Sequence, residues 1–210
     1  MDSHHAVLTA LEEEIVCSSS DLLLSGPATA LDPASLHLPL PPLSSVGTRF
    51  RQTSVGALLA SACRDVLQVD AALINGGSIK GSAEYENGQI SYLQLQRELP
   101  FPTKMCVVPM PGRVLQEALT YSRAGEETDE RRGYLQVDAG VEVDEANDHQ
   151  ILRVQGAAFD PKATYYVGIP RNLFKGIFDI RPLVQYVGGH CHFWRCSSAK
   201  LTSCGGNSSP

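Results

Sequence analysis

The 210-residue sequence lacks a long apolar run and lacks an excess of positive charge. No stretch approaches the ~20 apolar residues that a helix needs to cross a bilayer, which excludes a membrane span. Near the start, Glu12, Glu13 and Glu14 stand where a secretory signal would need apolar side chains. The formal net charge of −6 provides no field that would gather a nucleic acid. These absences predict a cytoplasmic protein whose partners include neither a membrane nor a nucleic acid.

The sequence also lacks the Cys-x-x-Cys pairs that are typical of structural zinc sites. Three of the six cysteines are widely spaced and predict reduced thiols, two of them in the core: Cys17, Cys63 and Cys106. The other three stand near two histidines at the end of the sequence: His190, Cys191, His192, Cys196 and Cys204. Because their spacing does not fit a zinc site, we expect an irregular tail over residues 189–210, with zinc binding as the alternative.

What is present fits one domain with a real core, since 43% of the residues are hydrophobic. Residues 1–48 become rich in Ser, Leu and Pro, which favours a lead-in or linker. Residues 49–188 alternate helical and strand patterns, and strand patterns dominate their second half. We therefore predict a mixed α/β domain over residues 49–188.

Individual elements are predicted from caps and from hydrophobic periodicity. Thr53 or Ser54 can cap a helix whose apolar residues recur at intervals of three and four, and Ser91 can cap a second helix that ends at Pro100. Pro111 favours the first turn of a third helix. Strands are expected at residues 71–74, 105–110, 134–137, 141–143, 151–154 and 164–169.

Asn75, Gly76 and Gly77 follow the first predicted strand and form the most informative motif. Glycine lets the backbone turn sharply and lets its N–H groups approach a ligand. Asn75 adds an amide, Lys80 a cation for phosphate, and Phe101 a flat face on which a base can stack. The plain alternative is that the two glycines only form a turn.

The order of several short motifs resembles the C-terminal domain of 5′-nucleotidases. These motifs cover about residues 46–180 and comprise Arg-Phe-Arg-Gln at 49–52, Ala-Leu-Ile-Asn-Gly-Gly-Ser-Ile-Lys at 72–80, Leu-Pro-Phe at 99–101, Gly-Tyr-Leu-Gln-Val at 133–137 and Thr-Tyr-Tyr-Val at 164–167. The resemblance implies a mixed sheet packed with helices. In that family an N-terminal metallophosphoesterase domain carries two metals and hydrolyses the phosphate ester, while the C-terminal domain binds the nucleoside and helps to hold the phosphate.

The resemblance also implies roles for particular residues. Arg49 corresponds to the family's Arg before the first helix, Asn75 to the amide near the base, Lys80 to the cation that ends the Asn-Gly-Gly motif, and Phe101 to one of two stacking rings. Gly76 and Gly77 belong to the same substrate-binding motif. Arg49 pairing with a surface carboxylate is the structural alternative.

Two departures from the family pattern weaken the expected site. Lys80 replaces the usual Arg and loses its planar fork for phosphate. The segment over residues 171–179 lacks the family's Gly-Gly-Asp-Gly, so the second ring would have to come from Phe174. Phe174 and Phe178 as ordinary core aromatics are the alternative.

Apart from an isolated Asp-x-His at residues 2–4, the sequence lacks the Asp-x-His, Gly-Asp and Gly-Asn-His motifs that a two-metal phosphoesterase requires. We therefore expect no catalytic residue, metal site or cofactor in this chain, with the divalent metals belonging to a catalytic domain that is missing here. The first hypothesis is a truncated, nucleotide-recognising domain of a 5′-nucleotidase-type hydrolase in nucleotide catabolism, which binds a nucleoside or nucleotide weakly and works with a metallophosphoesterase domain. The second is a non-catalytic binding or interaction module that retains the fold.

Overall fold

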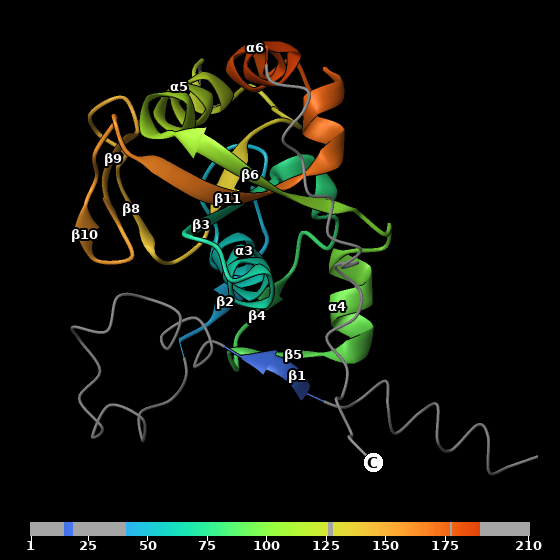
Figure 1. Cartoon of the computed structure of the whole chain (residues 1–210). Helices are drawn as coiled ribbons and strands as arrows, with labels where there is room; N and C mark the ends of the chain where they lie inside the picture. Colours follow the sequence, from blue (N-terminus) through green and yellow to red (C-terminus); the bar gives the residue numbers. More distant parts are fainter. Residues whose placement is uncertain (1–14, 19–40, 126–127, 177, 190–210) are drawn as a thin grey trace, which may run out of the picture.

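A four-stranded mixed sheet forms the centre of the protein, seen here in a computed structural model that describes residues 15–18, 41–125, 128–176 and 178–189 (Figure 1). The strand order is β6-β11-β3-β7. β11 runs parallel to β3, and the two outer pairings are antiparallel. The strands are β3 (Ala71–Asn75), β6 (Met105–Pro111), β7 (Leu135–Val137) and β11 (Thr164–Pro170).

Helices cover both faces of this sheet. α3 (Ser54–Leu67) lies on one face, and α5 (Gly112–Arg123) and α6 (Arg181–Gly189) lie on the other (Figure 1). The all-buried strand β3 serves both faces, because Ala71 and Leu73 join the core under α5 and α6 while Ala72 and Ile74 join the core under α3. This alternation follows from the two-residue period of a strand.

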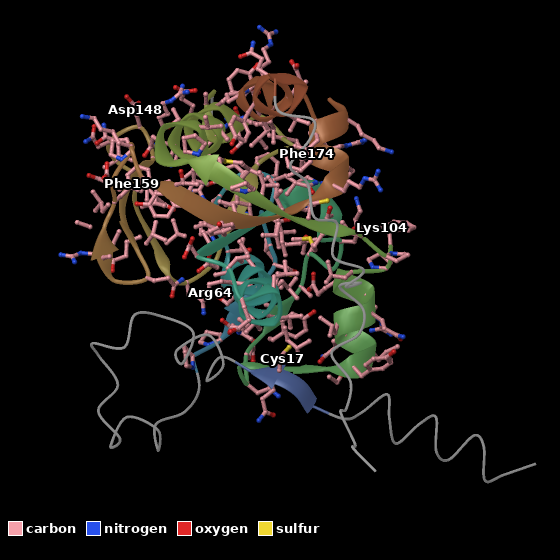
Figure 2. The ribbon with its side chains drawn as sticks, in the orientation of Figure 1. Cys17, Arg64, Lys104, Asp148, Phe159 and Phe174 are labelled. Carbon is pink, nitrogen blue, oxygen red and sulfur yellow. The ribbon has the colours of Figure 1, made fainter. Side chains whose placement is uncertain are left out.

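α3 begins where the sequence predicts. The Thr53 side chain accepts a hydrogen bond from the Gly56 N–H, and Gln68 ends the helix in the left-handed conformation. Its buried face contacts β3, β7 and β11. Arg64 on this helix forms a buried ion pair with Asp138, with 2.8 Å between Nη1 and Oδ1 (Arg64 is labelled in Figure 2). The predicted helix and its packing on the strand at residues 71–75 are confirmed.

The other predicted helices and strands are also confirmed, with shifted ends. α4 (Tyr92–Glu98) starts with a capping box in which Ser91 and Gln94 bond each other's backbone N–H groups. Pro111 caps α5 from outside instead of occupying its first turn. The two predicted strands after β7 are β8 (Val141–Asp144) and β9 (Gln150–Val154). With β10 (Ala157–Ala158) they form a separate three-stranded sheet in which β9 is central.

Several short elements were not predicted. β1 (Ile15–Ser18) pairs with β5 (Gln89–Ser91), and β2 (Leu43–Ser44) pairs with β4 (Glu84–Tyr85). Two short 3₁₀ helices, η2 (Gly76–Ser78) and η3 (Arg171–Lys175), follow β3 and β11. α6 also had no counterpart in the sequence analysis.

Packing extends before residue 49, the expected start of the domain. Leu43 is 1% exposed and belongs to the core under α3, and Ser45 and Thr48 are also buried. Residues 43–48 are thus joined to the domain by strand β2 and by the buried side chain of Leu43. The expected tail and its Cys and His residues beyond 189 lie outside the described residues.

Cys63 and Cys106 are buried in the two cores, as predicted for structural thiols. Cys63 packs under α3, and Cys106 packs under α5 and α6.

Candidate functional site

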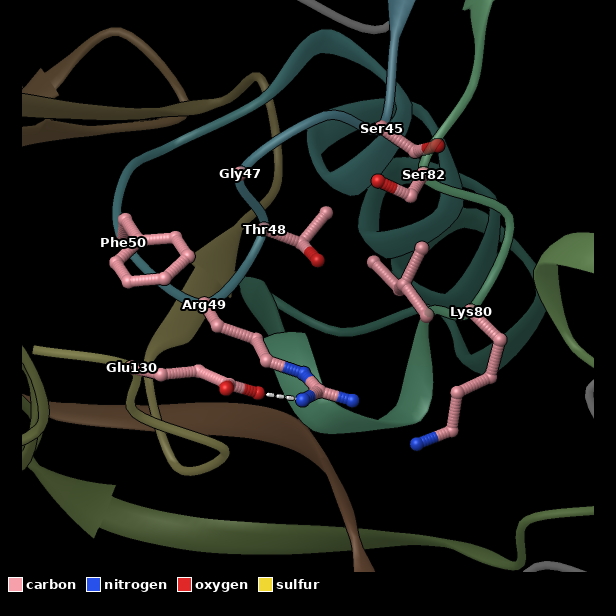
Figure 3. A pocket seen from close by; sticks show the side chains of 9 residues that line it. Ser45, Gly47, Thr48, Arg49, Phe50, Lys80, Ser82 and Glu130 are labelled. Carbon is pink, nitrogen blue, oxygen red and sulfur yellow. Dashed lines mark ion pairs between the residues drawn. The ribbon is translucent and has the colours of Figure 1, made fainter.

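A pocket of about 290 Å³ opens between three chain segments (Figure 3). The turn between β2 and α3 forms one wall, the residues after η2 form the second, and Glu130 closes a third side. The lining residues are Ser45, Gly47, Thr48, Arg49, Phe50, Ile79, Lys80, Ser82 and Glu130.

Two of the predicted site residues, Arg49 and Lys80, meet in this pocket. Figure 3 shows the guanidinium of Arg49 and the ammonium of Lys80 extending into the same part of the space. The pKa of Lys80 is lowered from 10.5, first by partial burial and then by the positive charges of Arg49 and Arg132. A lysine whose pKa is lowered by neighbouring cations marks a region of excess positive charge, which favours an anionic ligand.

Arg49 also forms an ion pair with Glu130, drawn as a dashed line in Figure 3. The side chains are 26% and 51% exposed, so the pair lies at the mouth of the pocket in contact with water. The surface ion pair that we considered as the alternative role of Arg49 therefore exists, and it lies within the pocket.

The turn that carries Arg49 is fixed from behind by Gln136 on β7, which is fully buried. Its Oε1 accepts a hydrogen bond from the Thr53 N–H at 2.8 Å. Its Nε2 donates to the carbonyl oxygens of Thr48 at 2.8 Å and Arg51 at 2.6 Å. Three points on residues 48–53 are thus held by one side chain of the central sheet, which places the Arg49 backbone at the pocket.

Glu98 at the end of α4 holds the opposite wall and is also fully buried. Its carboxylate accepts hydrogen bonds from Ser45 Oγ at 2.7 Å, Tyr85 Oη at 2.6 Å and the Gly81 N–H at 3.0 Å. The Lys80 N–H donates to the Glu98 carbonyl at 2.9 Å. Burial, and next the bond to Glu98, raises the pKa of Tyr85, so its hydroxyl stays protonated as a donor.

Asn75 lies behind the pocket and serves the fold. It has no exposed surface, its Nδ2 donates to the Arg132 carbonyl at 3.1 Å, and its Oδ1 accepts from Ser78 Oγ at 2.8 Å. In this arrangement both ends of the amide are engaged within the protein. A contact between Asn75 and a base stays a prediction.

Gly76 and Gly77 are required by close contacts between backbones. A Cβ at Gly76 would lie 1.9 Å from the Thr48 carbonyl oxygen, and one at Gly77 would lie 2.7 Å from that of Arg132. Their N–H groups donate to the carbonyls of Tyr134 and Arg132, so they do not point at a ligand as the sequence analysis anticipated. The glycines position the pocket wall by letting residues 48–49 approach, and direct ligand contact stays a prediction.

The two predicted aromatic residues lie outside the pocket lining. Phe101 is 68% exposed and is not among the lining residues. Phe174 packs against the core under α5 and α6, as does Phe178, and Figure 2 shows Phe174 on that side of the molecule. The alternative interpretation of Phe174 and Phe178 as core aromatics agrees with this packing.

Sequence reasoning missed two lining residues of chemical interest, Phe50 and Glu130. Phe50 is 38% exposed and follows Arg49 directly, so its place in the motif Arg-Phe-Arg-Gln was a signal for it. Glu130 lies in a charged segment, and no local sequence pattern distinguishes it there from its acidic neighbours.

Over the described residues, no group of three or more His, Cys, Asp or Glu side chains has the placement of a metal site. Within the same part of the chain, every helix is too short or too polar to cross a membrane.

Comparison with known proteins places this geometry in a family context. The family model "5'-nucleotidase, C-terminal domain" matches residues 34–177. Among solved structures, the fold is similar to a 5′-nucleotidase precursor from Thermus thermophilus, with a TM-score of 0.61 and 19% identity. It is also similar to the NAD nucleotidase of Haemophilus influenzae, with a TM-score of 0.61 and 14% identity. A comparison with curated proteins gives no match.

Both structural matches cover 95% of this chain but only 37% and 35% of the other proteins. The sequence therefore spans just over one third of the length of these relatives. The mixed sheet covered by helices on both faces agrees with the fold that the sequence resemblance implied. Because the family model matches more than half of the residues, this chain belongs to the 5′-nucleotidase C-terminal domain family.

Proposed function

We propose that this chain binds the phosphate of a nucleotide in the pocket between Arg49 and Lys80. The observation that carries the proposal is that these two cations, from segments 31 positions apart in the sequence, line the same pocket from two of its walls. The family membership supports a nucleotide as the ligand.

The chemistry of the pocket suits a phosphate group. A guanidinium donates two parallel hydrogen bonds to a phosphate, and an ammonium contributes a compact point charge. Ser82 adds a hydroxyl group to the lining, and Phe50 offers an aromatic ring near the edge of the pocket. One ring in place of two gives the base about 1–3 kcal/mol of stacking, so we expect a dissociation constant in the millimolar range.

In the larger context, we propose that the chain is the nucleotide-recognising part of a 5′-nucleotidase-type phosphohydrolase in nucleotide catabolism. The residues of this chain do not fit a pair of catalytic metals, since over the described residues no three His, Cys, Asp or Glu side chains lie together as a metal ion would require and the sequence lacks the Gly-Asp and Gly-Asn-His motifs. A metallophosphoesterase domain, from another chain or from a longer form of this protein, would supply hydrolysis. This chain's own residues bind and orient the nucleotide.

The proposal is tested by titrating AMP and inorganic phosphate into the ¹⁵N-labelled protein while following amide chemical shifts. We expect shifts at residues 47–50 and 79–82, and we expect Arg49→Gln and Lys80→Gln each to weaken AMP binding at least about fivefold, the equivalent of about 1 kcal/mol. Lys162→Gln is the matched control, because Lys162 is exposed and outside the pocket lining. Absence of shifts in this region at 20 mM ligand would contradict the proposal.

A second candidate is the non-catalytic interaction module. The burial of Asn75 and the position of Phe101 outside the pocket lining favour it, because both residues belong to the expected base-binding half of the site. Under this alternative the fold is retained and the titration above shows neither phosphate nor nucleoside binding.

A further inference from the structure

Glu130 is the one acidic residue among those that line the pocket. Its carboxylate contacts the Arg49 guanidinium, at the end of the pocket that also receives Lys80 (Figure 3). A carboxylate accepts hydrogen bonds from an arginine in the same way as two phosphate oxygens do. Glu130 therefore engages donors of Arg49 that a bound phosphate would use.

The backbone holds Glu130 opposite Arg49. The N–H of Arg131 donates to the Arg49 carbonyl at 3.0 Å, and the carbonyl of Arg131 accepts from the Tyr134 N–H at 3.0 Å. The next carbonyl, of Arg132, accepts from the Gly77 N–H at 2.9 Å and from Asn75 Nδ2 at 3.1 Å. These bonds tie residues 131–134 to the turn that carries Arg49 and to the end of β3. The ion pair is consequently built into the framework of the pocket.

The charges in the pocket are unequal. Arg49 and Lys80 contribute two positive charges and Glu130 one negative charge, while Arg132 lies close enough to lower the pKa of Lys80 further. A monoanion that displaces Glu130 from Arg49 only exchanges one negative charge for another. A dianion engages Arg49 and Lys80 together and is attracted more strongly than a monoanion, but the negative charge of Glu130 also repels it more strongly.

We propose that Glu130 is an internal competitor for the phosphate subsite, which weakens the binding of every phosphate that must displace it from Arg49 and opposes a dianionic monoester more strongly than a singly charged diester. The proposal rests on the proposed function of the same pocket. Glu130 opposes the binding of phosphate by its charge, whereas Arg49 and Lys80 contribute the attraction and the preference for a dianion.

The test compares the wild-type chain with Glu130→Gln, which keeps the shape and removes the charge. The probes are AMP, a monoester; adenosine 3′,5′-cyclic monophosphate, a diester; and adenosine, which has no phosphate. Dissociation constants come from amide chemical shifts at low salt and pH 8, where the monoester is a dianion. Asp129→Asn is the matched control, because it removes the same charge from the adjacent residue, which does not line the pocket.

We expect the wild-type chain to prefer AMP over the cyclic diester. Glu130→Gln should tighten both, AMP by about two- to fivefold, as removal of a competing exposed ion pair implies. The preference for AMP should widen, because the negative charge that is removed repels the dianion more than the singly charged diester. Adenosine binding should stay unchanged in Glu130→Gln, and all three ligands should bind Asp129→Asn as they bind the wild type.

Three other outcomes overturn the inference in distinguishable ways. If Glu130→Gln binds AMP and the diester as the wild type does, while Arg49→Gln loses AMP, the proposed function stands and the role of Glu130 fails. If adenosine tightens as much as AMP, Glu130 acts on shape and not on charge. If neither phosphate compound binds to any of the proteins, the proposed function itself fails.

Discussion

Two sets of polar residues surround the pocket, and they differ in how fully the protein itself uses them. Gln136 and Glu98, behind the walls, have no exposed surface and engage several backbone or hydroxyl groups each. On the walls, Arg49 is partly exposed and Lys80 is exposed. Arg49 forms an ion pair with Glu130, which also lines the pocket. The first set determines where the walls stand, and the second set is available to a ligand.

The difference follows from the cost of burying polar groups. A buried polar side chain without hydrogen-bond partners loses its hydration and destabilises the fold. Gln136 and Glu98 can be buried because neighbouring groups form hydrogen bonds with their polar atoms. Charges at the surface retain water, and their loss changes stability little. Substitutions behind the walls should therefore affect folding, whereas substitutions on the walls should affect binding.

The largest effect is expected at Gly76, where Ala should destabilise the protein by about 3 kcal/mol or more. The added Cβ would lie 1.9 Å from a backbone oxygen of Thr48, which has no flexible end that can yield. Gly188→Ala is the matched control, because nothing lies within 4 Å of its Cβ position in helix α6. Urea unfolding measures the stability of both variants. Equal stability of Gly76→Ala and Gly188→Ala would contradict a structural role for the close contact at Gly76.

Gln136→Ala should cost about 2–4 kcal/mol of unfolding free energy. It removes the partners of the Thr53 N–H and of the carbonyls of Thr48 and Arg51, each a buried or partly buried group. Gln150→Ala, at an exposed position of β9, should change stability by less than about 0.5 kcal/mol. If Gln136→Ala unfolds at the same urea concentration as the wild type, the Gln136 side chain is not what fixes the turn at residues 48–53.

Arg49→Gln and Lys80→Gln should change the unfolding free energy by less than about 0.5 kcal/mol while weakening AMP binding. Urea unfolding and the AMP titration, made on the same samples, separate the two effects. A loss of about 2 kcal/mol or more in either variant would place that residue with the framework set.

The smallest effect concerns the titration of Lys80. Its pKa in the folded protein lies below 10.5, because of partial burial and the charges of Arg49 and Arg132. Since the unfolded chain then binds more protons, the unfolding free energy should rise slightly as pH increases from the folded pKa towards 10.5. A bound phosphate should raise the pKa of Lys80, which lysine side-chain NMR measures with Lys80→Arg for assignment. An unchanged pKa in saturating AMP would contradict contact with the phosphate.

Much of the fold could be predicted because local signals and packing agree. α3 has a threonine cap and apolar residues at intervals of three and four, and α4 has a serine cap with glutamine three residues later. Strands β3 and β6 are continuous apolar runs. The pairs β1-β5 and β2-β4 were not predicted, because strands of two to four residues are too short to show a hydrophobic period and their partners are remote in the sequence.

The candidate site was predicted in part. Arg49 and Lys80 were chosen from motifs and do share a pocket, while Phe101 and Phe174 do not line it. Glu130 was missed because nothing local distinguishes one acidic residue of a charged loop from the next. Its role depends on backbone bonds to Arg49, a residue 81 positions away in the sequence.

The sequence by itself determined the helices, the main strands and the supply of chemical groups, because caps, periodicity and composition act over a few neighbouring residues. Only the tertiary structure decided which of those groups remain available. In the folded protein the amide of Asn75 and the N–H groups of Gly76 and Gly77 form hydrogen bonds to other segments, whereas Arg49 and Lys80 line a pocket. The reason is that burial and hydrogen-bond partnership depend on contacts between residues far apart in the chain, which no local pattern encodes.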